Sequence, residues 1–224
     1  MKKLPYLICF CIAINLIVPA AQSQKWTPLF DGKTLHGWKN ATKDLAPDSA
    51  WSVADKELSF DPTKGHGTDI TTTKSFKDFD FTLEFKISEG GNSGIKFFLI
   101  PNTTLGCEFQ IIDDTKHPDA ALGVGGNRKA GSLYDLIPAK EDKKLKPAGK
   151  WNTVRVYSKG KHVEHWLNGD KVVEYERGSE AFKRAVANSK FKTTKGFAEP
   201  TSSPILLQAH GDKVYYRNIK IKEL

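Results

Sequence analysis

Cysteine is scarce in this sequence of 224 residues, which contains three. Cys9 and Cys11 lie in an apolar N-terminal segment, so removal of that segment would leave Cys107 alone. A chain with one cysteine cannot form an internal disulfide, even in an oxidising compartment. Its stability must therefore come from a buried core, and a chain of about 200 residues buries roughly 70% of its unfolded surface. One domain is the expected organisation.

Several catalytic motifs are missing as well. There is no Gly-x-Ser-x-Gly elbow, and Cys107 sits in a hydrophobic run, so nucleophilic esterase or protease chemistry is not supported. No His-x-x-x-His or Cys-x-x-Cys spacing indicates a metal centre. The Glu-x-Asp-x-x-Glu triplet, with which jelly-roll glucanases place carboxylates about 5 Å apart, is also absent. Direct glycosidase chemistry of that kind is therefore disfavoured.

The N-terminal segment has the pattern of a secretory signal peptide. Lys2 and Lys3 precede an apolar run over residues 4–18, and small residues follow, with Ser23 as the expected cleavage position and Ala21 as the alternative. The run is too short for a typical transmembrane helix, although a retained N-terminal anchor is the alternative interpretation. We predict a signal peptide over residues 1–23, export to the periplasm or the extracellular space, and a mature domain over residues 24–224 without a stable membrane span.

Positive charge exceeds negative charge, but it is not concentrated. The formal net charge is +8. The densest basic stretch, residues 140–146, also contains Glu141 and Asp142. Nucleic-acid binding favours clustered arginines and interleaved aromatic residues on one face. We therefore predict no nucleic-acid partner and interpret this stretch as a solvated loop.

Alternating apolar and polar residues predict an all-β protein. Residues 79–87 alternate without a break, which is typical of a strand that buries one face in an antiparallel sheet. Similar runs cover residues 51–60, 94–100, 107–112, 151–158, 163–167, 171–175, 205–208 and 214–221. Short strands with frequent turn signals indicate a sandwich or a barrel.

Turn and capping signals complete this prediction. Asn168-Gly169 lies between two strand-like runs and predicts a tight hairpin, because both turn positions need a positive φ. The Ser158 to Lys161 segment predicts another reversal. One short helix is expected from Ser179 as N-cap to about Asn188.

Polar residues recur on one face of two of the predicted central strands. In an extended strand Glu108 and Gln110 point to one side, and Cys107 and Phe109 to the other. On the preceding strand Lys96 is expected to share its face with Phe98, opposite Ile95 and Phe97. This polar face is either ordinary solvated surface or the floor of a site for a polar ligand.

The histidines give a weaker signal. His117 follows the pair Asp113 and Asp114, whereas His165 and His210 lie in or at the end of predicted strands. A strand histidine more often packs or forms hydrogen bonds than catalyses a reaction. The acids, amides and histidines together could hold one divalent metal ion, without a spacing that specifies it.

Taken in order, several segments resemble the 3-keto-disaccharide hydrolase family. They are residues 29–38, 91–96, 108–114, 117–120, 131–136, 151–152, 165–169 and 217–221, and they cover essentially the whole predicted mature chain. The resemblance implies a concanavalin A-like jelly-roll β-sandwich of two antiparallel sheets, and cleavage of glycosides whose glucose is oxidised at C3. The sequence departs from the family at one position: members usually have Gln-Asp-His-Gly where this chain has Gln208-Ala209-His210-Gly211. The missing aspartate puts full activity in doubt.

The implied chemistry assigns roles to seven residues. A C3 ketone acidifies the C2 hydrogen, so the site needs a base, an electrophile for the enolate oxygen and an acid for the leaving group. We expect Glu108 or His210 as the base and Lys96, or a divalent cation in its place, as the electrophile. The substrate-positioning residues are expected to be Gln110, Asp113 and Tyr134, with Trp166 either stacked on a sugar or packed in the core. No organic cofactor is expected.

Two other functional classes stay open. A non-catalytic carbohydrate-binding module can have the same fold, and Ala209 favours it. A structural exported domain is the second alternative. The sequence gives no indication of the aglycone, the linkage or the oligomeric state.

Overall fold

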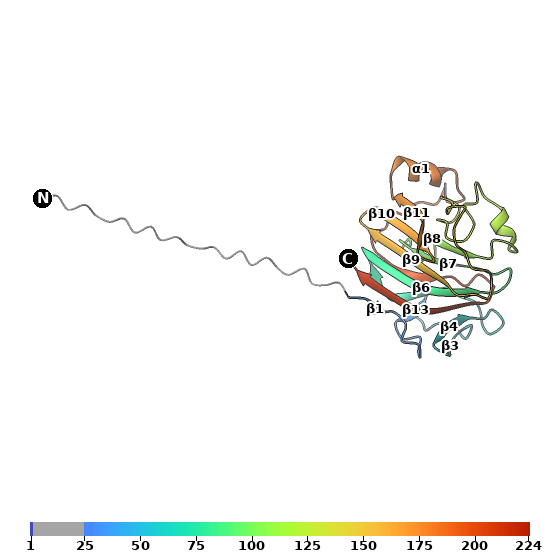
Figure 1. Ribbon diagram of the computed structural model, residues 1–224. Helices are drawn as coiled ribbons and strands as arrows, with labels where there is room; N and C mark the ends of the chain where they lie inside the picture. Colours follow the sequence, from blue (N-terminus) through green and yellow to red (C-terminus); the bar gives the residue numbers. More distant parts are fainter. Residues whose placement is uncertain (2–24) are drawn as a thin grey trace.

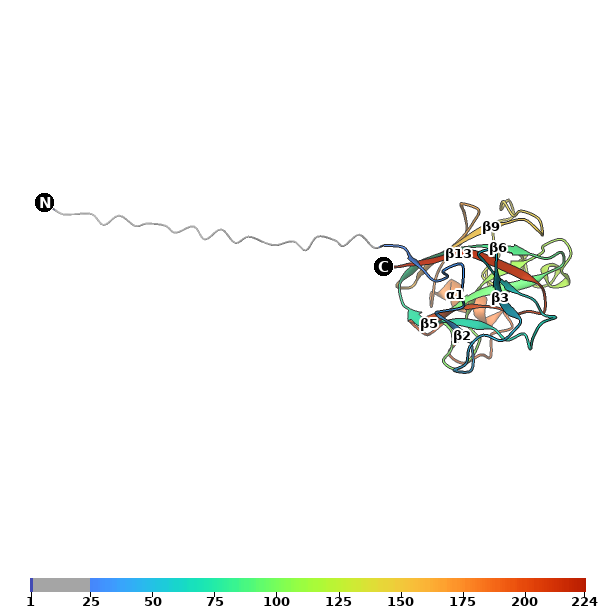
Figure 2. The same ribbon diagram turned by 90° about the horizontal axis from the view of Figure 1, so that it is seen from below.

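Two antiparallel β-sheets form the computed structural model, which describes residue 1 and residues 25–224. The first sheet contains β1 (Thr27–Pro28), β3 (Trp51–Ala54), β4 (Glu57–Phe60), β6 (Phe79–Ile87), β9 (Asn152–Lys159), β10 (His162–Leu167), β11 (Asp170–Glu176) and β13 (Val214–Glu223). The second contains β2 (Trp38–Asn40), β5 (Ile70–Phe76), β7 (Asn92–Phe97), β8 (Cys107–Ile112) and β12 (Ser203–Leu207). The predicted all-β sandwich is thus confirmed, and its two layers are visible in Figure 2.

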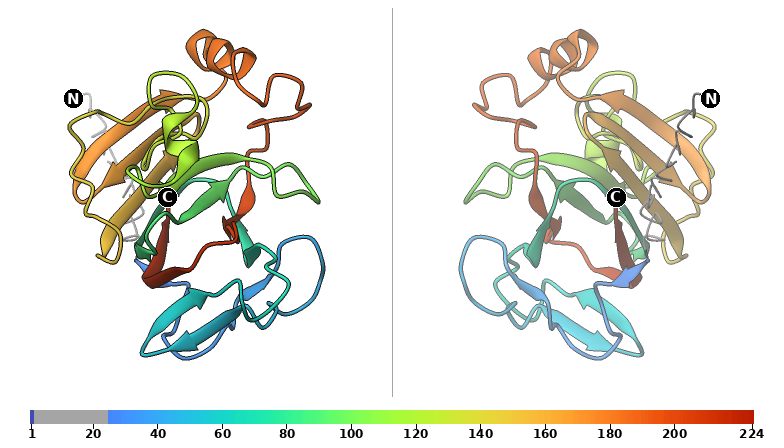
Figure 3. Two further views of the ribbon diagram at one scale, coloured as in Figure 1. Left: turned by 90° about the vertical axis from the view of Figure 1, so that its right-hand side faces the viewer. Right: turned by 90° about the vertical axis from the view of Figure 1, so that its left-hand side faces the viewer.

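The strand order shows how distant parts of the chain come together. The larger sheet runs β11-β10-β9-β6-β13-β4-β3, with β1 paired to β13, and the smaller runs β2-β5-β12-β7-β8. The two β-strands that carry the polar residues singled out above, β7 and β8, are therefore neighbours at one edge of the smaller sheet. Helix α1 (Glu180–Ala187) lies at the opposite end of the molecule from the β3–β4 hairpin (Figures 1 and 3).

One hydrophobic core joins the two sheets. β6 shows the reason, because Phe81, Leu83 and Phe85 are almost completely buried while Thr82 and Glu84 are partly exposed. These apolar side chains belong to the same cluster as Ile95, Phe109 and Leu207 of the smaller sheet. The alternation predicted from the sequence is therefore the division between the core and the outer face.

The turns follow the predicted chemistry. Asn168 and Gly169 have φ values of 50° and 90°, as a two-residue hairpin with two positive φ angles requires. The prediction of one strand over residues 51–60 is wrong, because Asp55 and Lys56 also take positive φ and divide the segment into β3 and β4.

The structure contains the predicted helix and one strand, β5, that was not predicted. The helix begins after Ser179, whose hydroxyl accepts a hydrogen bond from the backbone N–H of Phe182, and ends at Asn188 as expected. Strand β5 was not predicted, since Thr71, Thr72 and Thr73 interrupt any apolar alternation. It forms because β2 and β12 supply hydrogen-bonding partners on both sides.

Phe98 does not share the face of Lys96, contrary to the prediction. Strand β7 ends at Phe97, and Phe98 has a positive φ of 54°. This backbone conformation turns the Phe98 ring into the core, where its centroid lies 5.4 Å from that of Phe97. The alternation of a strand holds only as long as the backbone stays extended.

Residues 2–23 of the predicted signal peptide, including Cys9 and Cys11, lie outside the described residues. Among the described residues, Cys107 is a free, buried thiol. The described part of the chain contains no helix that is both long enough and apolar enough to cross a membrane.

Candidate functional site

The antiparallel register of β7 and β8 brings the predicted polar residues together. Lys96 lies directly opposite Glu108, and Gly94 opposite Gln110. Residues opposite each other in such a pair have side chains on the same face, with Cβ atoms about 5 Å apart. Lys96 Nζ is 4.0 Å from Glu108 Oε2. The side chains of these strands that face away from the core thus converge instead of spreading into solvent.

These residues line a small polar cavity on the outer face of the smaller sheet. The cavity measures about 80 Å³, well below the roughly 300–1,000 Å³ of typical ligand pockets. It therefore admits the edge of a small polar molecule rather than a whole large one. Its walls are Asn92, Lys96, Thr104, Leu105, Gly106, Glu108, Gln110, Tyr134, Lys190, Phe191, Gln208 and His210.

Glu108 supplies a buried carboxyl group to the wall of the cavity. The residue is 6% exposed, and burial raises the pKa of its carboxyl, while the positive charge of Lys96 opposes that shift. Gly94 leaves the space in which the Glu108 side chain lies. A carboxyl group with a raised pKa next to an ammonium group is a candidate for proton transfer near neutral pH.

His210 enters the cavity from the segment that follows β12. Its side chain is accessible to solvent, yet desolvation by the surrounding groups lowers its pKa, which favours the neutral ring. Asn92 Nδ2 lies 3.5 Å from His210 Nε2. The backbone N–H of Asn92 donates to Asp212 Oδ2 at 3.0 Å, which ties β7 to the same segment. His210 is therefore the second group that can accept a proton.

Tyr134 closes one side of the cavity and is held by a charged network. Its hydroxyl donates to Asp119 Oδ2 at 2.8 Å. Arg128 donates to both Asp119 Oδ1 and Asp135 Oδ1, at 2.7 and 2.6 Å. Burial, followed by the interaction with Asp119, raises the pKa of Tyr134, so this side chain serves as a neutral hydroxyl group. It can position a polar ligand rather than remove a proton.

Two charged residues of the site were not predicted. Lys190 follows α1 and places Nζ 4.1 Å from the centre of the Tyr134 ring, and burial lowers the pKa of its ammonium group. Asp69 precedes β5 and accepts a hydrogen bond from the backbone N–H of Ala209 at 2.8 Å. Burial raises the pKa of Asp69, although Lys96 opposes this. The site thus has a carboxylate beside position 209, although the residue there is alanine.

Asp113 and Trp166 lie outside the cavity. The Asp113 carboxylate accepts hydrogen bonds from Thr115 and from the backbone N–H of Gly90, so it shapes a turn after β8. Trp166 lies on β10 in the other sheet, where its indole donates to Glu164 Oε2 at 2.8 Å. Five of the seven predicted site residues therefore lie together in the cavity: Lys96, Glu108, Gln110, Tyr134 and His210. Asp113 and Trp166 lie elsewhere.

The side chains of His117, His210 and Asp212 form a cluster of the kind that can hold a divalent cation. Their ligand atoms lie within 4.8 Å of one another. However, the Nδ1 atom of His117 accepts a hydrogen bond from the backbone N–H of Asp119 at 3.1 Å. A neutral ring that accepts at Nδ1 carries its proton on Nε2, and that nitrogen cannot bind a metal. His117 in this orientation presents a donor, so the three residues do not fit a cation as they stand.

Buried His165 lies in the core and takes no part in the cavity. It is completely buried, and its Nδ1 lies 3.0 Å from the backbone carbonyl of Gly131. The rings of Phe97, Phe109 and Tyr175 surround it. Burial lowers the pKa of His165 to about 4, which keeps the ring neutral at physiological pH.

Comparison with known proteins gives a family for this arrangement. The sequence profile of the 3-keto-alpha-glucoside-1,2-lyase-like domain matches residues 25–222. A 3-keto-disaccharide hydrolase from Bacteroides thetaiotaomicron is 34% identical, over an alignment that covers 88% of this chain and 77% of the relative.

Solved structures agree with the family match. A presumed glycosyl hydrolase from Parabacteroides distasonis ATCC 8503 superposes with a TM-score of 0.75 at 32% identity, covering 89% of this chain and 94% of that one. A carbohydrate-binding module from Bacillus subtilis superposes with a TM-score of 0.52 at 12% identity, covering 84% of this chain and 96% of that one. The second likeness concerns the fold alone.

Proposed function

The chain belongs to the 3-keto-alpha-glucoside-1,2-lyase-like domain family, and from this premise we propose that it cleaves glycosides whose glucose carries a ketone at C3. The hydrolase from Bacteroides thetaiotaomicron and the presumed glycosyl hydrolase from Parabacteroides distasonis support a carbohydrate-cleaving activity. The observation that carries the proposal is the facing pair Lys96 and Glu108, 4.0 Å apart in the floor of the polar cavity.

Elimination accounts for the cleavage without the carboxylate triplet of jelly-roll glucanases. A base removes the C2 hydrogen as a proton, and the electrons of the C–H bond form an enolate whose charge is on the C3 oxygen. The enolate then collapses to a C1–C2 double bond and expels the glycosidic oxygen, which takes up a proton and leaves as the free aglycone. Addition of water across the double bond completes a net hydrolysis.

The Lys96–Glu108 pair suits the first step. The C2 hydrogen and the C3 oxygen are on adjacent carbons, so base and electrophile must be neighbours, as these two side chains are. We assign Glu108 as the base and Lys96 as the group that stabilises the enolate oxygen. His210 is the alternative base, and Gln110 and Tyr134 position the sugar.

A divalent cation bound next to the enolate oxygen is the alternative to Lys96 as the stabilising group. A divalent ion held by the site could polarise the ketone in place of Lys96. We favour Lys96, because its ammonium group already faces the base, whereas the His117 tautomer is unsuited to metal binding. Dialysis against a chelator separates the two arrangements, because it would remove a bound cation and leave Lys96 in place.

The proposal is tested with a 3-keto-glucoside in deuterated buffer. Loss of the C2 hydrogen is followed by nuclear magnetic resonance, and release of the aglycone is followed separately. Glu108→Gln is expected to lower both rates by about 100- to 10,000-fold, the usual effect of losing a base. His210→Gln is expected to affect C2 exchange less than Glu108→Gln does. Near-normal turnover by Glu108→Gln would remove Glu108 from the mechanism.

A non-catalytic carbohydrate-binding module is the second candidate. The small volume of the polar cavity favours it, since a sugar edge can bind there without reacting. Incubation of the purified protein with 3-keto-trehalose separates the two functions, because a binding module releases no product.

Export is a further part of the proposal. The basic and apolar N-terminal residues support cleavage after Ser23 and a periplasmic or extracellular location. N-terminal sequencing of the protein from the periplasm or medium of expressing bacteria tests this. A mature N-terminus at Gln24 is expected.

A further inference from the structure

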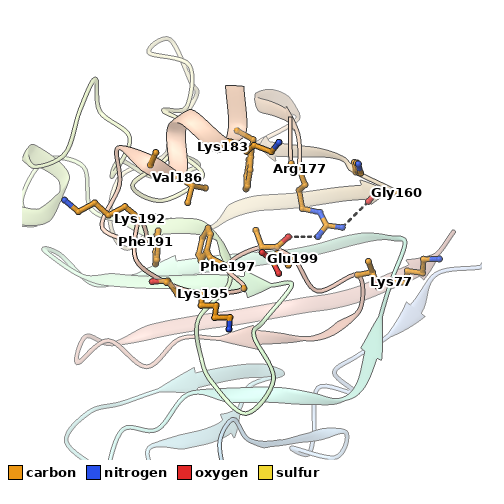
Figure 4. A pocket seen from close by; sticks show the side chains of 18 of the residues that line it. Lys77, Gly160, Arg177, Lys183, Val186, Phe191, Lys192, Lys195, Phe197 and Glu199 are labelled. Carbon is orange, nitrogen blue, oxygen red and sulfur yellow. Dashed lines mark hydrogen bonds between the residues drawn. The ribbon is translucent and has the colours of Figure 1, made fainter. Parts of the chain in front are cut away.

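A second and much larger cavity, here called the helix pocket, lies against α1. It measures about 770 Å³, within the range of about 300–1,000 Å³ for small-molecule sites. Side chains of α1 form one wall, and the segment after α1 forms the other (Figure 4). Its lining includes Arg177, Phe182, Val186, Phe191, Phe197 and Ala198.

The walls of the helix pocket are apolar and well supported. Phe182, Phe191 and Phe197 are each less than 10% exposed. The rings of Phe191 and Phe197 stack with centroids 4.2 Å apart, and Phe182 stacks on Tyr175 at 5.6 Å. Aromatic rings fixed in this way form a preformed surface for a flat apolar ligand.

The rim of the helix pocket carries a net positive charge. Lys77, Lys161, Lys192 and Lys195 are exposed along it, and within residues 25–224 none of the four forms an ion pair. Asp78 and Glu199 also line the pocket, but the positively charged side chains outnumber them, and a net positive charge around an apolar pocket favours a negatively charged ligand. The rim therefore indicates an apolar ligand that also carries a negative charge.

Arg177 adds a buried positive charge to the same pocket. Its guanidinium donates to the backbone carbonyls of Ala198, Pro200 and Gly160, at 3.0, 2.8 and 3.2 Å. No carboxylate within the described residues pairs with it, and its Nε atom, in a side chain only 7% exposed as a residue, has no hydrogen-bond partner. The guanidinium carbon lies 3.5 Å from the centre of the Phe98 ring, which compensates part of the charge, and an anion beside it would add a further favourable interaction.

Phe191 connects the helix pocket with the site of the proposed reaction. It lines both the polar cavity and the helix pocket, and Lys190 next to it lines the polar cavity. Since the polar cavity admits only the edge of a sugar, the remainder of a glycoside must lie outside it. The helix pocket is the large preformed space that shares a wall with the polar cavity.

We propose that the helix pocket binds the aglycone of the glycoside that is cleaved in the polar cavity, and that this aglycone is an aromatic group carrying a negative charge. The inference rests on the proposed function and adds the substrate class to it. Phe182, Phe191 and Phe197 contact the aromatic rings, and the basic rim together with Arg177 attracts the anion.

Binding of the released aglycone tests the pocket without catalysis. Isothermal calorimetry compares 6-hydroxy-2-naphthoate with uncharged 2-naphthol. The anion is expected to bind about tenfold more tightly, which corresponds to about 1.4 kcal/mol. The double variant Lys192→Glu and Lys195→Glu is expected to remove this preference. The control Lys33→Glu and Lys64→Glu makes the same change in net charge at exposed positions outside the pocket and is expected to retain it.

Kinetics then test the role of the helix pocket in the reaction. The substrates are the 3-keto-glucosides of phenol and of 6-hydroxy-2-naphthoate, both with aryl leaving groups. The naphthoate glycoside is expected to have a kcat/KM about tenfold higher, mainly through a lower KM. Val186→Glu, which places a carboxylate on the α1 wall, is expected to abolish the difference by lowering kcat/KM for the naphthoate glycoside more than for the phenyl glycoside.

The outcomes distinguish the two proposals. If the phenyl glycoside is cleaved but naphthoate neither binds nor improves kcat/KM, the aglycone assignment is overturned and the proposed function stands. If naphthoate binds as expected but no 3-keto-glycoside is cleaved, the proposed function and the aglycone role both fail. Concentration-dependent dimerisation that Val186→Glu abolishes would identify a second copy of the chain as the occupant, and would also overturn the assignment.

Discussion

The Glu108 carboxylate lies over Gly94 of the neighbouring strand, in the space that a side chain at position 94 would fill. A Cβ atom on Gly94 would come within 2.8 Å of Glu108 Cδ. The backbone at Gly94 is outside the left-handed region, so its conformation does not require glycine. Glycine is needed at position 94 because any side chain there would occupy the space of the Glu108 carboxylate, the proposed base.

We therefore expect Gly94→Ala to inactivate the protein while preserving its fold. The added methyl group must displace the Glu108 carboxylate from its position 4.0 Å from Lys96. Misplacement of a base by about 1 Å can cost roughly 100-fold in rate. The measurements are kcat on a 3-keto-glucoside and the thermal midpoint of unfolding.

A double variant supplies the control for this prediction. If Gly94→Ala acts through Glu108, adding it to Glu108→Gln should lower kcat little further, because residues in contact are not additive. If the fold decreases in kcat of the two single variants instead multiply in the double variant, Gly94→Ala does not act through Glu108.

The difference between the predictable and the unpredictable parts of the site has a physical cause. Alternation along a strand specifies which face a side chain takes, so Glu108 and Gln110 could be placed together from the sequence. It does not specify which sheet a strand joins, and Trp166 lies in the other layer for that reason. Asp69 and Lys190 come from connecting segments, whose approach to the site depends on tertiary packing.

Most of the strands were predictable for the same reason. The bounds of β6 and β8 match the predicted runs because in both strands alternate residues face the hydrophobic core. The predicted direction of the Phe98 side chain was wrong, since a single positive φ turns this side chain toward the core. Strand β5 was not predicted, because its stability comes from pairing with β2 and β12 rather than from an alternating sequence pattern.

Lys190 is expected to protonate the leaving group. It faces the cavity beside Tyr134, and its lowered pKa makes proton donation easier than for an ordinary lysine. Lys190→Met should slow cleavage of a 3-keto-disaccharide by about 100-fold, but hardly affect a 3-keto-glucoside of 4-nitrophenol, whose leaving group needs no proton. The measurement is kcat for the two substrates. Equal losses on both would assign Lys190 a purely structural role.

The pH dependence of kcat/KM should reflect Glu108 and Lys190. Burial raises the pKa of Glu108 above its ordinary 4.5, so activity that needs the carboxylate is lost as the pH falls through this raised value. Burial lowers the pKa of Lys190 below its ordinary 10.5, so activity that needs the ammonium group is lost before that pH is reached. Lys190→Arg should move the alkaline limb upward. An unchanged alkaline limb in this variant would exclude Lys190 as its source.

Removal of metal ions should leave turnover intact. Lys96 provides the positive charge at the enolate oxygen, so dialysis against a chelator is expected to change kcat by less than twofold. Lys96→Met should lower kcat by about 100- to 1,000-fold, as the loss of a group that stabilises an oxyanion does. Inactivation by the chelator, with recovery on adding zinc or calcium ions, would favour a bound cation over Lys96.

Stability is expected to fall below pH 6.5 because of the buried His165. Its pKa is about 4 in the folded protein and 6.5 ordinarily. Between these values the unfolded chain binds a proton that the folded protein does not, so the free energy of unfolding decreases as the pH falls from 6.5 to 4. The full difference corresponds to about 3 kcal/mol. Urea unfolding at several pH values measures this slope.

His165→Leu should flatten the slope of stability against pH, even though the carbonyl of Gly131 then loses its donor and overall stability drops by about 1–3 kcal/mol. His66→Leu, at an exposed histidine, should keep the slope of the wild type. An equally steep slope in His165→Leu would mean that other groups, such as the carboxylates of the ion pairs, determine the acid sensitivity of the fold.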